Sequence, residues 1–155
     1  MSEPFYIRIA GAKNSGKTTL IVALIAELTA RGFRVATLKH TSHDHEFDRR
    51  GSDSQRHGAA GSAASVIVSP GRFVCHAQRP PADELSRLLR CMYAGCDVIL
   101  CEGYTDLSPG DAPAPLIECV APGEKTFFAD DADIVALVAS DDLSTGLPVF
   151  ERTQI

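Results

Sequence analysis

The sequence has no long apolar run, no excess of basic residues and no regular cysteine pattern. No apolar stretch approaches the roughly 20 residues of a membrane-spanning helix, and the N-terminus lacks the basic-then-apolar pattern of a secretory signal. The 155 residues carry a formal net charge of −5, which disfavours a broad basic surface for nucleic acid. These absences favour a cytoplasmic protein that binds neither nucleic acid nor membrane.

Cysteine is too scarce and too irregularly spaced to suggest a disulfide framework. The five cysteines make an odd number, and no two of them form a Cys-x-x-Cys pair. Three lie in apolar runs, where a small apolar side chain fits. The pattern predicts reduced, mostly buried thiols, although the even spacing of Cys91, Cys96 and Cys101 leaves a metal or redox role open.

Apolar strands and amphipathic helices alternate along the chain. Strands are predicted at 4–10, 34–39, 97–103, 116–120 and 133–142, with a short final strand within 146–155, and helices at 18–32 and 80–95. Short strand–helix–strand connections predict parallel strands in a right-handed βαβ unit. Two close segments, 65–69 and 72–76, predict a β-hairpin. We expect an α/β fold in a single domain over 1–155, a mainly parallel sheet flanked by helices with an additional β-hairpin.

Two segments depart from this regular pattern. The range 40–61 is polar and has neither helical nor strand periodicity, which predicts a long loop. Arg8 interrupts the apolar strand 4–10, although a central parallel strand is normally apolar on both faces. We therefore expect one face of the sheet to be only partly covered near Arg8.

The glycine-rich segment between the first strand and the first helix is the strongest functional signal. Its spacing matches the P-loop pattern G-x-x-x-x-G-K-[ST] in the strand-to-helix context that this motif requires. Glycines let successive N–H groups point at phosphate oxygens, and the helix N-terminus adds its positive dipole. Lys17 is expected to reach the β- and γ-phosphates, and the Thr18 hydroxyl to ligate magnesium. The predicted phosphate-binding residues of this P-loop NTPase-like fold are Gly11, Lys13, Asn14, Ser15, Gly16, Lys17, Thr18 and Thr19.

Two carboxylates are expected at the carboxyl ends of strands, where ligands gather in open parallel sheets. Glu102 ends the apolar segment 97–103 and is the predicted second residue on the magnesium side, followed by Gly103 for close backbone approach. Asp141 follows the strand at 133–142 and could accept both N–H donors of guanine, which adenine does not offer. The Asn-Lys-x-Asp motif of GTPases is absent. A solvated strand-end acid and a turn acid are the alternative interpretations.

The polar segment 40–61 holds a cluster of histidines and carboxylates. Three histidines in six residues suggest a zinc or nickel site, whereas the position of the segment suits the nucleotide-sensing switch of a P-loop protein. A solvated loop without a ligand is the third possibility. The candidate residues of a switch or active-site loop are His43, Asp44 and Asp48, and Asp44 and Lys17 are the candidate catalytic residues.

Taken in order, these segments resemble the MobB-type molybdopterin-guanine dinucleotide biosynthesis proteins. The resemblance covers nearly the whole chain, and its most specific part runs from Lys39 to Gly61. Two departures are present: Thr105 follows Tyr104 where the family commonly carries lysine, and the helix usual after "LPVF" is missing. The segments that carry the resemblance are 11–20, 31–62, 96–104, 134–142 and 147–150.

The resemblance implies a mainly parallel sheet, binding of GTP and Mg²⁺, and a slow intrinsic GTPase activity. It implies a homodimer that assists a partner nucleotidyltransferase in joining GMP to molybdopterin, with molybdopterin itself as a candidate ligand. If the family's residue roles apply at the matching positions, residues 11–19 bind phosphates and Thr18 and Glu102 bind magnesium. Asp141 then lies at the end of the strand that binds the base. A small-molecule P-loop kinase and a metallochaperone-type GTPase are the alternatives from the residues alone.

Overall fold

The computed structural model describes residues 3–41, 48–103, 114–141, 143 and 145–151 of the chain. The chain divides into two compact units, the first comprising Met1–Thr41 with Leu89–Ile155 and the second Ser42–Leu88. None of the helices in the described ranges has the length and apolar character needed to cross a bilayer.

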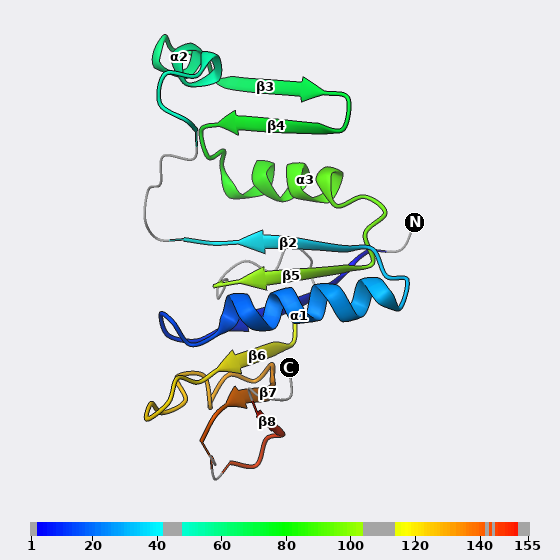
Figure 1. Cartoon of the computed structure of the whole chain (residues 1–155), viewed down its shortest axis with the longest axis vertical. Helices are drawn as coiled ribbons and strands as arrows, with labels where there is room; N and C mark the ends of the chain where they lie inside the picture. The colour runs from blue at the N-terminus through cyan, green and yellow to red at the C-terminus, as the bar shows by residue number, and fades with distance from the viewer. Residues whose placement is uncertain (1–2, 42–47, 104–113, 142, 144, 152–155) are drawn as a thin grey trace. The chain divides into compact units, whose positions relative to one another are not determined.

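The first unit is built on a six-stranded sheet in which every pair of neighbouring strands is parallel (Figure 1). The strand order is β2–β5–β1–β6–β7–β8, so β5 separates β1 from β2 although these two flank the same helix in sequence. The predicted α/β fold with a mainly parallel sheet is confirmed. The strands are β1 (Phe5–Ala10), β2 (Val35–Lys39), β5 (Val98–Glu102), β6 (Leu116–Cys119), β7 (Ile134–Ala139) and β8 (Val149–Glu151).

Helix α1 (Lys17–Ala30) covers one face of this sheet and forms the main core with it. Leu20 and Ile21 are buried there against the inward side chains of the strands, among them Ile9 and Leu100. Leu24, Ile25 and Leu28 pack against the same cluster. The spacing that predicted the helix is therefore the spacing of its contacts with the sheet.

The second unit contains α2 (Asp53–Ala59), β3 (Ala64–Ser69), β4 (Arg72–Ala77) and most of α3 (Ala82–Met92), whose last residues belong to the first unit. The antiparallel pair β3–β4 confirms the predicted hairpin. The prediction of a structureless loop over 40–61 was wrong for its second half. Ser52 caps α2 by accepting a hydrogen bond from the Gln55 amide at 3.2 Å. A seven-residue helix with a single buried residue has no apolar stripe to detect.

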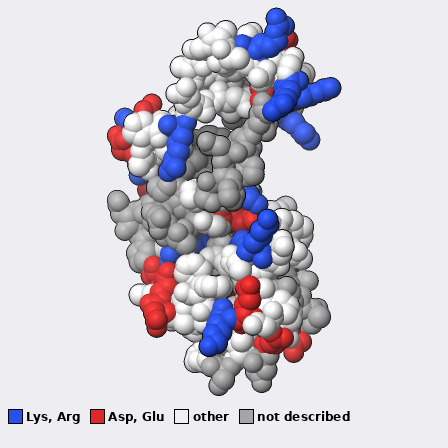
Figure 2. Space-filling model, turned by 90° about the vertical axis from the view of Figure 1, so that its left-hand side faces the viewer, with Lys and Arg blue, Asp and Glu red and all other residues white. Residues whose placement is uncertain are grey.

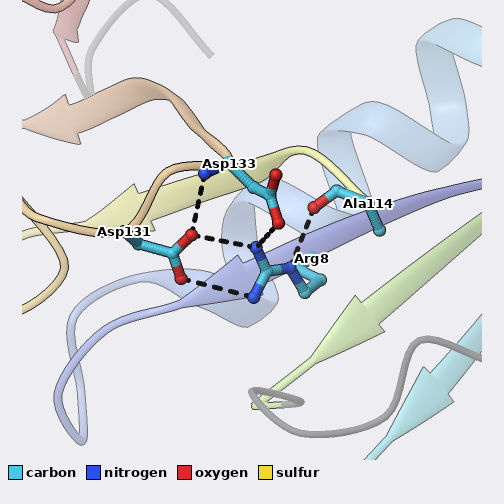
Figure 3. A network of polar contacts seen from close by, with 4 residues as sticks. All are labelled: Arg8, Ala114, Asp131 and Asp133. Carbon is cyan, nitrogen blue, oxygen red and sulfur yellow. Dashed lines mark hydrogen bonds and ion pairs between the residues drawn. The ribbon is translucent and has the colours of Figure 1, made fainter. Parts of the chain in front are cut away.

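Arg8 lies in the central strand β1 and only 8% of it is exposed, which corrects the expectation of a partly covered sheet face. Its guanidinium forms ion pairs of 3.2 Å with Asp131 and 3.1 Å with Asp133, and its Nε donates to the Ala114 carbonyl at 2.9 Å (Figure 3). Both aspartates precede β7 in the chain. The charge is tolerated in the sheet because two carboxylates and a carbonyl satisfy it there.

The cysteine prediction holds only in part. None of the five cysteines forms a disulfide, but only Cys101 and Cys119 are buried, whereas Cys75 and Cys91 are exposed. Cys75 lies on the hairpin and Cys91 on α3, which leave apolar side chains open to solvent. Burial in the central strand β5 raises the pKa of the Cys101 thiol to about 11, so this thiol is protonated at neutral pH.

Candidate nucleotide site

The P-loop motif lies between β1 and α1, in the context predicted from the sequence. Gly11 has φ 134°, and a Cβ atom there would stand 2.1 Å from the Cys119 carbonyl oxygen. Asn14 and Gly16 also have positive φ values, 64° and 89°. These conformations turn the chain from the strand into the helix within a few residues, and only a residue without Cβ fits at position 11.

A groove of about 440 Å³ opens over this loop. All but one of its lining residues were predicted from the sequence as phosphate- or magnesium-binding positions. The exception is Lys39, the last residue of β2. The groove is lined by Lys13, Asn14, Ser15, Gly16, Lys17, Thr18, Thr19, Lys39 and Glu102.

The Lys17 side chain folds back over the loop from the first turn of α1. Its Nζ donates to the carbonyl oxygens of Gly11 at 2.9 Å and Ala12 at 2.5 Å. An ammonium group held by neutral carbonyls can exchange one of them for an anionic oxygen, which is the stronger acceptor. Lys17 therefore stands where a phosphate at the loop would meet it.

Thr18 and Glu102 meet at the rim of the groove, as predicted. The Thr18 hydroxyl is 3.3 Å and 3.4 Å from the two carboxylate oxygens of Glu102. A hydroxyl and a carboxylate are hard oxygen donors, which Mg²⁺ prefers, and the rest of its coordination is normally water and phosphate. The pair fits the predicted magnesium site. Gly103 has φ 71°, and a Cβ there would be 3.1 Å from the His40 carbonyl oxygen, so glycine suits the close contact between these two segments.

Lys39 is the functional candidate that the sequence analysis did not single out. Its Nζ lies 2.9 Å from Glu102 Oε1, and β2 and β5 place the two residues side by side in register. A lysine at the end of a strand is a weak signal by itself. Only the pairing of β2 with β5 brings it to the groove.

Asp141, the predicted base-reading residue, lies just beyond the carboxyl end of β7. Its Oδ2 accepts a hydrogen bond from the Gly123 amide at 2.7 Å, which connects Asp141 to the segment that follows β6.

The segment that follows β6 is also held by Glu118, a fully buried carboxylate on β6. Glu118 accepts from the backbone amides of Phe127 at 2.7 Å and Phe128 at 3.3 Å. The sequence analysis treated Glu118 only as part of a strand.

Of the predicted switch-like loop, His43 and Asp44 lie outside the described residues, as do Tyr104 and Thr105. Asp48 is described and belongs to the second unit. The hydroxyl of Ser54, with that of Ser52 and the amide of Arg49, holds the pKa of Asp48 below its usual value. Asp48 is therefore an anionic anchor for the start of α2, and its proposed contact with nucleotide stays a prediction.

Charge of both signs is present on one face of the sheet-bearing unit (Figure 2). On the face drawn in Figure 2, Lys and Arg over the sheet-bearing unit are interspersed with Asp and Glu and form no continuous basic area. Among the described residues, no group of three or more His, Cys, Asp or Glu side chains could hold a metal ion. Most of the histidine cluster lies outside those residues.

A parallel sheet whose first strand leads through a glycine-rich loop into a helix defines an α/β protein of the P-loop NTPase-like fold class. The family model "Molybdopterin guanine dinucleotide synthesis protein B" (MobB) matches residues 6–141. The chain belongs to this MobB family.

Individual relatives agree with the family model. The "Molybdopterin-guanine dinucleotide biosynthesis adapter protein" of Escherichia coli is 36% identical over 101 residues, or 63% of this chain and 58% of that protein. The "Probable molybdopterin-guanine dinucleotide biosynthesis adapter protein" of Bacillus subtilis is 27% identical over 93% of this chain and 83% of its own length. The match thus spans under two thirds of the Escherichia coli relative.

Solved structures resemble the fold over almost the whole chain. The crystal structure of Bacillus subtilis MobB has a TM-score of 0.73 at 25% identity, covering 96% of this chain and 90% of that one. A MobB protein homolog from Bacillus stearothermophilus has a TM-score of 0.65, also at 25% identity, over 96% of this chain and 88% of that one.

Proposed function

We propose that this chain is a cytoplasmic GTP-binding accessory protein with slow GTPase activity, which assists the attachment of GMP to molybdopterin. The observation that carries the proposal is the groove over the P-loop, where Lys17, Thr18 and Glu102 converge. Membership of the MobB family supports a role in molybdopterin-guanine dinucleotide biosynthesis.

The chain's own groups account for triphosphate binding. Backbone amides of the loop and the N-terminus of α1 would bind phosphate oxygens, and Lys17 would exchange its carbonyl partners for the β- and γ-phosphates. Thr18 and Glu102 would hold Mg²⁺, which when bound neutralises charge on the phosphates. The Gly11 conformation keeps the loop backbone open to the ligand.

Slow hydrolysis agrees with the make-up of the groove. No arginine lines it among the described residues, and arginines that stabilise the transition state are worth roughly 10³–10⁵ in rate. Asp44 is still the predicted catalytic carboxylate and lies outside the described residues. A slow intrinsic rate of GTP hydrolysis suits a protein that acts on its partner while nucleotide is bound, rather than through repeated turnover.

GTP should bind more tightly than ATP, and Asp141 should be the reason. A carboxylate that accepts both N–H groups of guanine is worth roughly 10- to 100-fold in affinity. Asp141→Ala should erase the difference. Asp141→Asn is the matched control for local structure, because its amide oxygen can keep the bond to the Gly123 amide but lacks the charge. Calorimetric titration with GTP, ATP and molybdopterin, each with and without Mg²⁺, measures these affinities. Equal GTP and ATP affinities in the parent protein would remove guanine from the proposal.

The partner that we propose is the nucleotidyltransferase that forms molybdopterin-guanine dinucleotide, with molybdopterin as a candidate ligand of the complex. The Escherichia coli relative is named as an adapter protein, which supports such a partnership. The Lys17 variant described in the Discussion tests whether stimulation of that enzyme depends on the groove.

The hairpin supports a homodimer, which we also propose. The registered pairs of β3 and β4 place six apolar side chains on one face of a two-stranded sheet. Val66, Val68 and Phe73 on that face are between 60% and 77% exposed. An isolated hairpin is marginally stable in water, so a second copy is expected to cover this face. The six side chains are those of Ala64, Val66, Val68, Phe73, Cys75 and Ala77.

Val68→Lys should shift the protein from dimer to monomer in sedimentation velocity runs. A lysine in the centre of an apolar contact would bring an unpaired charge into it. Ser69→Lys adds the same charge one residue further on, on the opposite face of the hairpin, and should leave the dimer intact. A monomeric parent protein, or an equal effect of both variants, would contradict this interface.

A further inference from the structure

Lys39 and Thr18 share one carboxylate oxygen at the rim of the groove. Lys39 Nζ is 2.9 Å from Glu102 Oε1, and the Thr18 hydroxyl is 3.3 Å from the same atom. The Glu102 side chain is 13% exposed, whereas that of Lys39 is 63% exposed. The carboxylate is thus fixed at the end of β5, and the lysine reaches it from solvent.

This ion pair is easily exchanged. An exposed lysine–carboxylate pair contributes little, because holding a long side chain in one place offsets most of the Coulomb attraction. Lys39 has a four-carbon stem and three rotatable donors, so its ammonium can move to another anion near the rim. A terminal phosphate over Lys17 would be such an anion, with more charge than a carboxylate.

We propose that Lys39 is a catalytic residue that binds the terminal phosphate of GTP and that Glu102 holds it beside the groove before nucleotide arrives. The inference rests on the proposed function, since it assigns a second lysine to the same triphosphate. It also makes Lys39 and a divalent cation competitors for Glu102, because both need the same carboxylate.

The chemistry requires only a positive charge that contacts the γ-phosphate. In hydrolysis, water attacks the γ-phosphorus, the bond from that phosphorus to the β–γ bridging oxygen breaks, and GDP leaves with the electron pair. The products are GDP, inorganic phosphate and a proton. Lys39 keeps its own proton throughout and neutralises charge on the non-bridging oxygens of the γ-phosphate.

Lys39→Met tests the phosphate contact by comparing GTP with GDP. Losing a charged hydrogen bond to the γ-phosphate should lower GTP affinity by about tenfold or more, and GDP affinity should change by less than about twofold. Lys39→Arg should recover most of the GTP affinity. Arg31→Met is the matched control, because it removes an equally exposed cation, 66% against 63%, that also pairs with a glutamate.

The proposed competition between Lys39 and Mg²⁺ for Glu102 can be measured without following GTP hydrolysis. In Lys39→Met the Mg²⁺ concentration for half-maximal GTP binding should fall by roughly two- to fivefold, because Glu102 no longer shares its charge with an ammonium. The control Arg31→Met should leave that concentration unchanged. Fluorescent GTP titrated with Mg²⁺ at constant ionic strength measures it.

The possible outcomes distinguish a failure of the inference about Lys39 from a failure of the proposed GTP-binding function. If the parent binds GTP but Lys39→Met keeps its GTP affinity and Mg²⁺ requirement, the inference is overturned and the proposed function stands. Equal losses for GTP and GDP would also overturn it, because they place Lys39 away from the γ-phosphate. A parent protein that binds no GTP overturns both. Lys39→Gln, checked by circular dichroism, repeats the comparison with a polar side chain should the methionine variant fold poorly.

Discussion

Replacing Lys17 by alanine should lower the affinity for GTP by about 100-fold or more and leave the fold intact. The expected loss is this large because an ammonium bonded to two phosphates makes several charge-assisted hydrogen bonds, each worth about 1.5–3 kcal/mol. Among the described residues, Lys17 Nζ donates to the carbonyl oxygens of Gly11 and Ala12, so the substitution removes these two hydrogen bonds from the nucleotide-free protein. Titration calorimetry with GTP and Mg²⁺ measures the affinity.

The stability of the Lys17→Ala variant is the internal check. Loss of two partly buried hydrogen bonds should reduce the free energy of unfolding by no more than about 1–3 kcal/mol, so thermal unfolding should remain cooperative. Arg31→Ala, at the other end of α1, removes one positive charge and should bind GTP as the parent does. The Lys17 variant should also fail to stimulate molybdopterin-guanine dinucleotide formation by the partner nucleotidyltransferase. Unchanged GTP affinity would refute the P-loop interpretation.

Replacing Arg8 by methionine should reduce the free energy of unfolding by about 2–4 kcal/mol. The methionine stem fills much of the same space, but Asp131 and Asp133 lose the cation that they share and the Ala114 carbonyl loses its donor (Figure 3). Urea unfolding followed by circular dichroism measures the change. Arg31→Met breaks the ion pair with Glu27, which is exposed on both sides, and should cost less than about 1 kcal/mol. Equal costs for the two variants would show that burial of Arg8 does not matter.

The same network predicts a response to acid. The Asp133 amide, which donates to the Asp131 carboxylate at 2.9 Å, and then Arg8 hold the pKa of Asp131 below 3.8. Because the folded pKa is depressed, this contribution is fully present above the unfolded value and is lost as pH falls through the folded one. In Arg8→Met the amide remains but the cation is gone. The difference in stability between parent and variant should therefore shrink as the pH falls from the ordinary aspartate pKa of about 4 towards the depressed pKa of Asp131, where this carboxylate becomes protonated.

Local patterns were sufficient for most secondary structure and for the core of the site. The helical periodicity of α1, the apolar strands and the close pair of hairpin segments are short-range signals, and each element formed where it was predicted. The P-loop motif is also local, since eight consecutive residues determine the loop and the start of the helix. The pairing of Thr18 with Glu102 followed from one general rule, that ligands gather at the carboxyl ends of parallel strands.

The errors have a common origin in contacts that a local pattern does not contain. Helix α2 depends on a serine cap rather than on an apolar stripe. Arg8 was expected to lie at a partly covered face because its two carboxylate partners are more than 120 residues away in the chain. Lys39 was overlooked because a terminal lysine gains a role only when β2 lies beside β5. The burial of Glu118 was not foreseen because the two amides that satisfy its carboxylate lie in the irregular segment that follows β6, where no periodic pattern places them.

The amino-acid sequence by itself determined the phosphate loop, the helix behind it and the alternation of strands that makes a parallel sheet, because steric freedom at glycine and side-chain periodicity act over a few residues. The tertiary structure alone decided which strands are neighbours, and with that which charges meet: Lys39 with Glu102, Arg8 with two aspartates, Asp141 with the Gly123 amide. Electrostatic and hydrogen-bonding partners depend on distances of about 3 Å in space, and strand order sets those distances independently of separation along the chain.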